Sequence, residues 1–479
     1  MAFGVGGRIM DGRHKKYRAW DAGLGGETAV SPREVLPEGD LVFFLLDCVG
    51  QLDLSAFHRR YEQSLRGQPP FDVTMMVTLL VYSYSLGVCS SRRIAAACER
   101  NLAFRAIVGD DPPDFRTLSD FRKLHQAAFG PLFLEVLRLA GEVGLVKLGN
   151  LSTDGTKIKA NASRHKAMSY GYMVKEIARL EAEIAQLLEQ AEQIDAEQDA
   201  ALGSRRGDEL PAELTRRTDR LAKIREAKAR LEAEAAAKAE EKQRLRDEAD
   251  AERDGKPPRG RPAAPIDSTP EDKAQTNFTD PEAKIMKQSN KGFDYSYNAQ
   301  AVVDGEAQIV LAAAVTNQAN DKRQAAPMAQ AALDNIKAAN LVRPTATDGE
   351  LLPIPNTADS GYFSAEAVVD LERIGMDPYI AIGRQKHHEA QVDGPVDQPS
   401  AAATVKQSMA HKLGTAVGKA LYAARKYIVE PVFGQIKGVR GIRQFLRRGI
   451  DAVSSEWQLI CLAHNFLKIW RHSTAAEPA

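Results

Sequence analysis

The chain has few cysteines and no long apolar run. Its 479 residues include four cysteines, none close to another in sequence: Cys48, Cys89, Cys98 and Cys461. This spacing argues against a disulfide framework or a zinc site and is typical of proteins in a reducing cytosol. No apolar stretch reaches the roughly 18 residues of a transmembrane span. The first twenty residues also lack the apolar core of a signal peptide, so we expect a cytoplasmic protein.

Net charge is also absent, because 64 Lys and Arg residues balance 64 Asp and Glu residues. The balance hides two regions of opposite sign. From Val405 to the end there are 12 basic and 4 acidic residues, a net charge of +8. From Met173 to Gly255 there are 16 basic and 22 acidic residues, a net charge of −6. The C-terminal region can therefore face phosphates while the acidic region points elsewhere.

The length predicts two to four domains with a full core. A Gly-rich start and several changes of hydrophobic period give the expected boundaries. We expect a flexible leader (1–40), a helical domain (41–145), an α/β domain in two parts (146–165 and 278–472), a helical insertion (166–255), a proline-rich linker (256–277) and a tail (473–479).

The helical domain offers two interpretations. Its apolar residues recur at helical spacing, and Thr117-x-x-Asp120 matches a capping box that would start a helix. Arg116, Arg122 and Lys123 place positive charge near that start. The domain is either an ordinary helical bundle with solvated charges or a helix-turn-helix-like bundle that binds DNA.

The insertion carries a heptad-like pattern. Apolar residues alternate at steps of four and three, as in a coiled coil, at Met173, Ile177, Leu180, Ile184, Leu187, Ala191 and Ile194. After a break at Gly203, Gly207 and Pro211, a second stripe follows at Leu214, Leu221, Ile224 and Leu231. The pattern predicts an antiparallel helical hairpin, and its acidity favours contact with protein over contact with DNA.

The remaining segments predict a mixed sheet. A strand-like segment holds Asp154, a hairpin turns at Asp304-Gly305, a helix covers about 321–340, and a short buried segment ends at Asp359. A helix, a strand and a helical region around Glu430 follow. Without the insertion, the order is β-β-β-α-β-α-β-α, which matches the ribonuclease-H-like α/β fold. In that fold the first and fourth strands lie side by side.

Three carboxylates would converge in such a fold, namely Asp154, Asp359 and Glu430. Phosphodiester cleavage requires an activated water and a stabilised leaving oxygen, and two metal ions about 3.5–4 Å apart supply both. Magnesium prefers hard oxygen ligands, so a few carboxylates suffice. We expect Asp154 to bridge two Mg²⁺ ions, Asp359 to bind one of them and Glu430 the other.

Each carboxylate has a simpler explanation. Asp154 precedes a glycine, a common turn pair, and Asp359 could cap a helix or form a turn. Asp304 and Asp348 are rival candidates. Asp304 fits a hairpin turn better than a site, whereas Asp348 lies in TATDGE, which resembles a strand end. Asp359 is preferred because a helical pattern follows it directly.

Basic residues surround Glu430. In a continuous helix Lys426 and Lys437 would lie on nearly the same face as Glu430 and could hold a DNA backbone, but Pro431 would kink the helix or begin a new one. A basic cluster that suits phosphate contact follows, although a solvated helix face would look the same: Arg440, Arg443, Arg447 and Arg448.

Several motifs, spread over much of 150–450, resemble those of bacterial insertion-sequence transposases of the DDE class: STDGTKIKANAS, NFTDPEAKIMK, GFDYSYNAQAVVD, ADSGYFSAE and IVEPVFGQIKGVRGIRQFLRRG. The resemblance is to the subgroup with a helical insertion after the first catalytic aspartate. It implies a ribonuclease-H-like catalytic domain with Asp154, Asp359 and Glu430 as metal ligands. It also implies the use of Mg²⁺, for which Mn²⁺ could substitute, and an N-terminal domain that binds terminal inverted repeats.

A related signature has Tyr, two residues, Arg, three residues, Glu, six residues and Lys. Tyr422, Arg425, Glu430 and Lys437 match it except for one extra residue between Arg425 and Glu430. Lys426 has the expected spacing to Glu430 instead. Either Arg425 or Lys426 therefore corresponds to the arginine of this signature.

The first hypothesis is a transposase that cleaves and joins DNA strands as a homodimer or larger assembly on double-stranded DNA, both terminal inverted repeats and target. It would be associated with the bacterial nucleoid and would have no membrane partner. Two alternatives remain. The chain could be a non-catalytic DNA-binding protein, such as a repressor or a decayed transposase, or a nuclease of the same fold without strand transfer.

Overall fold

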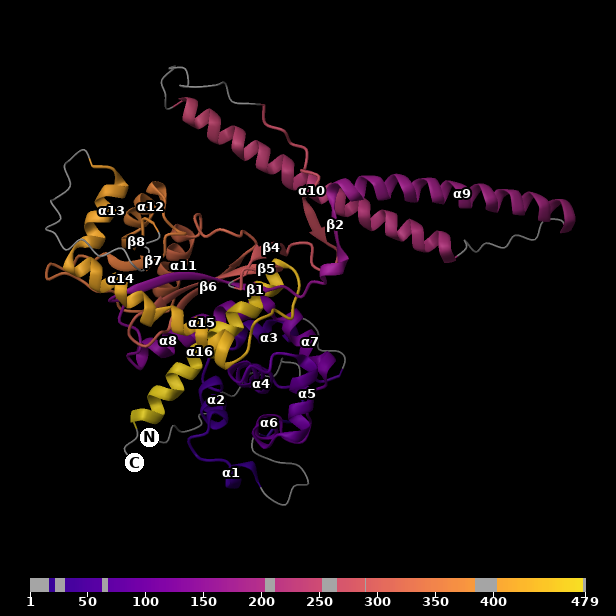
Figure 1. Cartoon of the computed structure of the whole chain (residues 1–479). Coiled ribbons are helices and arrows are strands. Elements are labelled where there is room, and N and C mark those ends of the chain that lie inside the picture. The colour runs from indigo at the N-terminus through magenta and orange to yellow at the C-terminus, as the bar shows by residue number, and fades with distance from the viewer. Residues whose placement is uncertain are drawn as a thin grey trace. The chain divides into compact units, whose positions relative to one another are not determined.

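The computed structural model describes residues 17–21, 31–62, 68–202, 212–251, 265–288, 290–383 and 403–476. The chain divides into two compact units, one of residues 1–160 and 285–479 and the other of residues 161–284 (Figure 1). Within the described residues, no helix combines the length and the apolar character needed to cross a bilayer.

The first unit contains a mixed sheet. Its strands are β1 (Leu151–Lys159), β4 (Lys284–Lys287), β5 (Phe293–Asp304), β6 (Val310–Thr316), β7 (Ile354–Ala358) and β8 (Met376–Ile380). Their order is β4-β5-β1-β7-β8, and β6 also pairs with β5. β5 is antiparallel to β1 and β6, whereas β7 is parallel to β1 and β8. The predicted α/β fold is confirmed, including the pairing of the strand that holds Asp154 with the strand that ends before Asp359.

Helices pack against this sheet. α11 (Ala325–Ala338) contacts β5 and β6, and α12 (Ala365–Arg373) contacts β8. α13 (Val405–Gly414) contacts β8, while α14 (Ala416–Ile428) contacts β1, β7 and β8. After α15 (Glu430–Gly434) and a π-helical turn (Gln435–Val439), α16 (Ile450–Ala476) contacts β6. The fully buried Trp457 of α16 packs near the rings of Phe433 and Phe445 and donates a 2.9 Å hydrogen bond to the backbone oxygen of Gln300.

The N-terminal helices share this core. They are α1 (Pro32–Val35), α2 (Leu41–Val49), α3 (Ser55–Glu62), α4 (Val73–Ser85), α5 (Ser91–Arg100), α6 (Leu102–Val108), α7 (Phe115–Leu124), η1 (Gln126–Ala128) and α8 (Phe129–Glu142). α4 and α8 both contact α16. Because α4 is buried along nearly its whole length, the helical segment and the sheet fold as one unit.

The predicted capping box of α7 is wrong. The helix begins at Phe115, and the Asp114 side chain caps it by accepting a 2.6 Å hydrogen bond from the backbone nitrogen of Thr117. An aspartate before the first turn satisfies a free amide directly. Thr117 therefore lies within the first turn of the helix.

Two other helix boundaries differ from the prediction. The helix expected at about 321–340 begins at Ala325, which leaves Asp321 in the connection from β6. The C-terminal helical region is interrupted at 440–449, between Gly441 (φ 69°) and Gly449 (φ 80°). These positive φ angles suit glycine and end a helix. The basic cluster from Arg440 to Arg448 therefore lies on an irregular segment, not on a helix face.

The second unit is built around two long helices. η2 (Arg164–Lys166) and β2 (Ala167–Ser169) lead into α9 (Tyr170–Leu202), which packs against α10 (Ala212–Ala251); β3 (Gln275–Asn277) follows and pairs with β2. The predicted stripe forms its core, with Met173, Leu180, Leu221, Ile224 and Leu231 buried.

Ion pairs join the two helices beside this apolar core. Arg217 contacts Glu183, Arg220 contacts Glu176, and Arg225 contacts Glu181. The glycine and proline break at 203–211 and the side chains of Ala191 and Ile194 lie outside the described residues.

Substitution of Gly155 in β1 tests how tightly the sheet is packed. A Cβ atom at this position would lie 2.2 Å from Nε2 of Gln300 and 2.9 Å from Oδ1 of Asn298. Because both amides are fully buried, Gly155→Ala should lower the free energy of unfolding by about 1–3 kcal/mol. Gly130→Ala in α8 is the matched control, since its Cβ would meet nothing within 4 Å. Denaturant titration of both variants checks this, and equal effects would contradict it.

Candidate active site

Asp154 and Asp359 come together through the pairing of β1 and β7. The register places Thr153 opposite Ala358, so the two aspartates follow at the same level of adjacent parallel strands. Ser152 and Thr357, each two residues earlier, hydrogen bond through their hydroxyls at 2.8 Å. Since side chains alternate along a strand, Asp154 lies on that same face of the sheet. Asp359 is the first residue after β7, and its charge raises the pKa of Asp154.

Arg425 links Asp154 to Glu430. On α14, its Nη2 donates to Oδ2 of Asp154 at 2.7 Å and its Nη1 to Oε1 of Glu430 at 3.2 Å. The Arg425 side chain is 12% exposed and that of Asp154 15%, whereas that of Glu430 is 52% exposed. Lys426 is exposed. Arg425, not Lys426, therefore contacts the carboxylates.

Glu430 begins a new helix. α14 ends at Ile428, and α15 starts at Glu430 with Pro431 in its first turn. This is the second of the two arrangements that the proline allowed. Lys437, in the π-helical turn, reaches β1: its Nζ donates to Oγ1 of Thr156 at 2.5 Å and to the backbone oxygen of Lys157 at 2.7 Å. Burial lowers the pKa of Lys437.

The surroundings of Asp154 disfavour its negative charge. Burial raises the pKa of this carboxyl to about 6, and the charges of Asp359 and Asp321 add to the effect, while Arg425 opposes it. Tyr422 on α14 lies close enough to feel the same charges. Its pKa is raised by burial first, and by Asp359 and Asp154. A cation placed among these carboxylates would relieve their repulsion.

Asp321 was missed by the sequence analysis. Its Oδ1 accepts hydrogen bonds from Nδ2 of Asn298 at 2.6 Å and from Nε2 of Gln300 at 2.7 Å, and it lies 3.3 Å from Nζ of Lys157. A signal for it existed in the strand NAQAVV, where two amides alternate with apolar residues. Buried amides need polar partners, and Asp321 is theirs.

The rival aspartates have structural roles. Asp348 is exposed and accepts a 3.1 Å hydrogen bond from the backbone nitrogen of Glu350, within a turn closed by the bridge between Thr345 and Leu351. Asp304 is fully buried and accepts from the backbone nitrogens of Leu148 and Glu306. Both hold turns, as the hairpin interpretation of Asp304 predicted.

Two of the predicted DNA contacts, Arg122 and Arg440, are buried in this structure. The Arg122 side chain is buried and donates to the hydroxyl of Tyr84, the backbone oxygen of Cys89 and the hydroxyl of Ser91. Arg440 is 8% exposed and donates to the backbone oxygen of Ile460 at 3.1 Å. Both guanidinium groups therefore make hydrogen bonds inside the protein, which the sequence did not predict.

The other predicted basic residues lie nearer the surface. Arg116, Lys123, Arg443 and Arg448 are exposed. Nε of Arg443 donates to the backbone oxygen of Lys437 at 3.0 Å, which places this arginine beside the π-helical turn. Arg447 is partly buried and donates to Oε1 of Gln126 at 3.0 Å.

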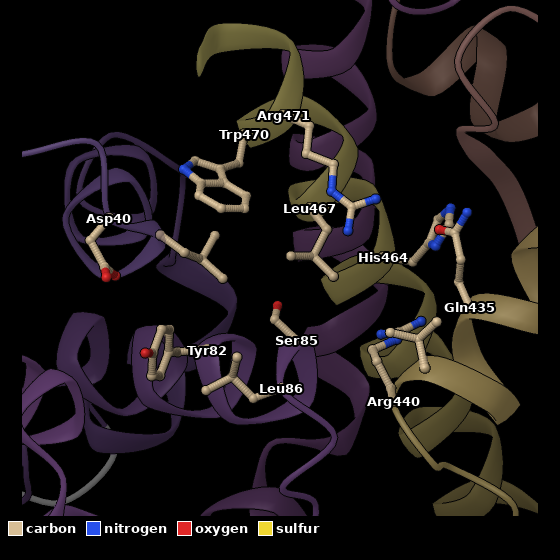
Figure 2. A pocket seen from close by; sticks show the side chains of 12 residues that line it. Asp40, Tyr82, Ser85, Leu86, Gln435, Arg440, His464, Leu467, Trp470 and Arg471 are labelled. Carbon is tan, nitrogen blue, oxygen red and sulfur yellow. The ribbon is translucent and has the colours of Figure 1, made fainter. Parts of the chain in front are cut away.

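A cavity of about 440 Å³ lies elsewhere in the first unit. Figure 2 shows Trp470 and Arg471 of α16 on one side of it and Tyr82, Ser85 and Leu86 on another. Its lining also includes Arg440 but none of the three carboxylates. Among the residues that the structure describes, the buried atoms Nε and Nη2 of Arg440 have no hydrogen-bond partner. This cavity is therefore not the candidate active site.

The donor set suits a hard divalent ion. Asp154, Asp359 and Glu430 offer only carboxylate oxygens, which Mg²⁺ prefers. No group of three or more potential metal ligands is already assembled among the residues that the structure describes. The guanidinium of Arg425 lies between Asp154 and Glu430 and supplies the positive charge there. The residues fit a metal once Arg425 moves aside.

The raised pKa of Asp154 predicts a pH dependence of stability in the metal-free protein. Its pKa is about 6 in the folded protein, against an ordinary value of 3.8 for an aspartate, so the folded state binds the proton more tightly. The free energy of unfolding contributed by Asp154 should therefore fall as the pH rises from about 4 to about 6. Unfolding midpoints of the wild type and Asp154→Asn, measured across this range, should diverge with pH. A constant difference would contradict the prediction.

Two family models match the chain. Residues 31–124 match a transposase domain (DUF772), and residues 258–466 match a transposase DDE domain. The second match includes Asp359 and Glu430, whereas Asp154 lies outside both. No curated protein and no solved structure matches the chain. Two transposase domain models match successive segments of the chain, and its sheet has the strand order of a ribonuclease-H-like fold. The chain is therefore a member of the insertion-sequence DDE transposases.

Proposed function

We propose that the protein cleaves DNA at the ends of an insertion sequence and joins those ends to target DNA, with Asp154, Asp359 and Glu430 as the metal ligands. The observation that carries the proposal is the pairing of β1, which holds Asp154, with β7, which ends just before Asp359, together with the contacts of Arg425 to Asp154 and Glu430. Members of the family act on DNA and generally use divalent metal ions, and Mg²⁺ is the ion that we propose here.

Two bound Mg²⁺ ions would activate the attacking oxygen and stabilise the leaving oxygen. Asp154, which is more buried than Glu430, is suited to the shared position between them. Asp359 and Glu430 would each hold one ion. The same arrangement serves cutting and joining, because water is the nucleophile in the first and a DNA 3′-hydroxyl in the second.

The chain's own cations would hold the DNA. Lys437 and Arg443 lie together beside β1 near Asp154, where a scissile phosphate would enter. Arg425, once released by the metals, can turn toward the same phosphate. Tyr422, Lys426, Arg447 and Arg448 extend this basic surface, and Arg116 and Lys123 of α7 would contact the terminal repeats.

The assembly that we propose is a homodimer or larger complex on two DNA ends. α9 and α10 lie in the acidic part of the sequence and carry many surface carboxylates. Negative charge repels the DNA backbone, so this hairpin is better suited to contact protein than DNA.

The triad predicts the outcome of a cleavage assay. Asp154→Asn, Asp359→Asn and Glu430→Gln should each lower the cleavage rate of a linear DNA with the flanking terminal repeats by at least about 10³-fold in Mg²⁺, because each removes a metal ligand. Binding of the same DNA should persist. Gel analysis of cut products, with a filter or shift assay for binding, measures both.

Asp348→Asn is the matched control, since Asp348 is exposed in a turn. It should cleave as the wild type does. Cutting that survives Asp359→Asn but not Asp348→Asn would reject the triad. A wild type that binds the repeats without cutting them would indicate a non-catalytic binder, and cutting without joining would indicate a nuclease.

The adjacent cations Arg425 and Lys426 should behave differently. Arg425→Gln removes the cation that would turn from Asp154 toward the scissile phosphate when the metals bind, so it should lower cleavage at least tenfold. Lys426→Gln removes an exposed charge, so it should only weaken DNA binding and reduce the slope of log affinity against log salt by about 1. Cleavage rates at saturating DNA and binding at several salt concentrations separate the two. The reverse pattern would assign the family's basic position to Lys426.

A further inference from the structure

A network of polar side chains lies beside the proposed site. Its members are Asp321, Asn298, Gln300 and Lys157. Asp321, in the connection between β6 and α11, is 21% exposed, and its Oδ1 is the shared acceptor of Asn298 and Gln300 at 2.6 and 2.7 Å. Both amides are fully buried on β5. Lys157 of β1 supplies the positive charge, with Nζ 3.3 Å from the same oxygen. One carboxylate therefore ties β1 and β5 to the start of the α11 connection.

This network contacts β1 on the face opposite to Asp154. Side chains alternate along a strand, so Gly155 and Lys157 face away from Asp154 and Thr156. Gly155 pairs with Gln300 and Lys157 with Asn298 across β1 and β5. The missing side chain of Gly155 leaves the space that the two amides fill. The backbone of β1 therefore packs against these two amides at Gly155, the residue that follows Asp154.

The same network reaches the turn that carries Asp359. The hydroxyl of the buried Tyr362 donates to Oε1 of Gln300, whose Nε2 donates to Asp321. Gly361 lies close to the carboxylates of both Asp359 and Asp321. A Cβ atom there would be 3.0 Å from Oδ1 of Asp359 and 3.7 Å from Oδ2 of Asp321. Asp321 therefore contacts β1, which carries Asp154, and is linked through Gln300 and Tyr362 to the turn that carries Asp359.

We propose that Asp321 is a positioning residue for the catalytic carboxylates. It holds β1 and the Asp359 turn in fixed relation through Gln300 and Tyr362, and it does not itself bind the metal. The proposal rests on the proposed function. A carboxylate is required because a single oxygen must accept from two amides and also neutralise Lys157, which an amide side chain cannot do.

Removal of Asp321 should loosen the metal ligands without removing any. Asp321→Ala should lower the cleavage rate at saturating DNA about 10–100-fold, the range for partners that orient metal ligands. The dissociation constant for the terminal-repeat DNA should stay within about twofold. Mn²⁺ binding to the DNA-free protein, measured by calorimetry, should weaken by a similar factor. Asp334→Ala on α11 is the control, since Asp334 is exposed and accepts from the exposed Gln330 side chain four residues earlier.

Tyr362→Phe provides a second test with little risk to the fold. It removes only the hydroxyl that joins Gln300 to the Asp359 turn, so it should lower the cleavage rate several-fold and leave DNA binding unchanged. If Asp321→Ala does not fold, this variant decides the question. Wild-type cleavage and Mn²⁺ affinity in Tyr362→Phe, or in a folded Asp321→Ala, would overturn the inference.

The failure of this inference is distinct from failure of the proposed function. If Asp154→Asn cleaves DNA as the wild type does, the proposed site itself is wrong. If Asp154→Asn is inactive while Asp321→Ala and Tyr362→Phe retain full cleavage and Mn²⁺ affinity, the site stands and only the positioning role of Asp321 is rejected.

Discussion

The parallel pairing of β1 with β7 is the constraint on which the candidate site depends. It brings Asp154 of β1 and Asp359, the first residue after β7, to the same level of two adjacent strands, although they are far apart in sequence. Two carboxylates in partly buried positions repel each other, and the raised pKa of Asp154 reflects burial together with that repulsion. The surrounding structure supplies positive charge on one face and rigid support on the other.

On the face of Asp154, Arg425 provides the charge. It lies on α14 and contacts both Asp154 of β1 and Glu430, the first residue of α15. On the opposite face, Asp321 and the amides of β5 fix the strand and the Asp359 turn. α16 then buries Trp457 against β5 and contacts α4 and α8, so the N-terminal helices and the catalytic sheet share one core.

Much of this was predictable from the sequence, because its local patterns agree with the fold. The order of strands and helices gave the neighbouring positions of β1 and β7, and the apolar stripe gave the packing of α9 on α10. The sequence could not give the contacts made by individual polar side chains. Arg122 and Arg440 looked like surface cations, but tertiary packing buries both. Asp321 looked like a helix start, and only the fold brings Asn298 and Gln300 to it. The choice between Arg425 and Lys426 likewise depended on which face of α14 meets β1.

The central claim is that Asp154 and Asp359 form one cation site whose charge Arg425 neutralises in the metal-free protein. Anomalous diffraction from crystals of the protein with Mn²⁺ tests it most directly. The account predicts a peak bound by both carboxylates, with the Arg425 guanidinium displaced from Asp154. A peak at another place, or an Arg425 that still bonds Asp154 beside an occupied site, would contradict it.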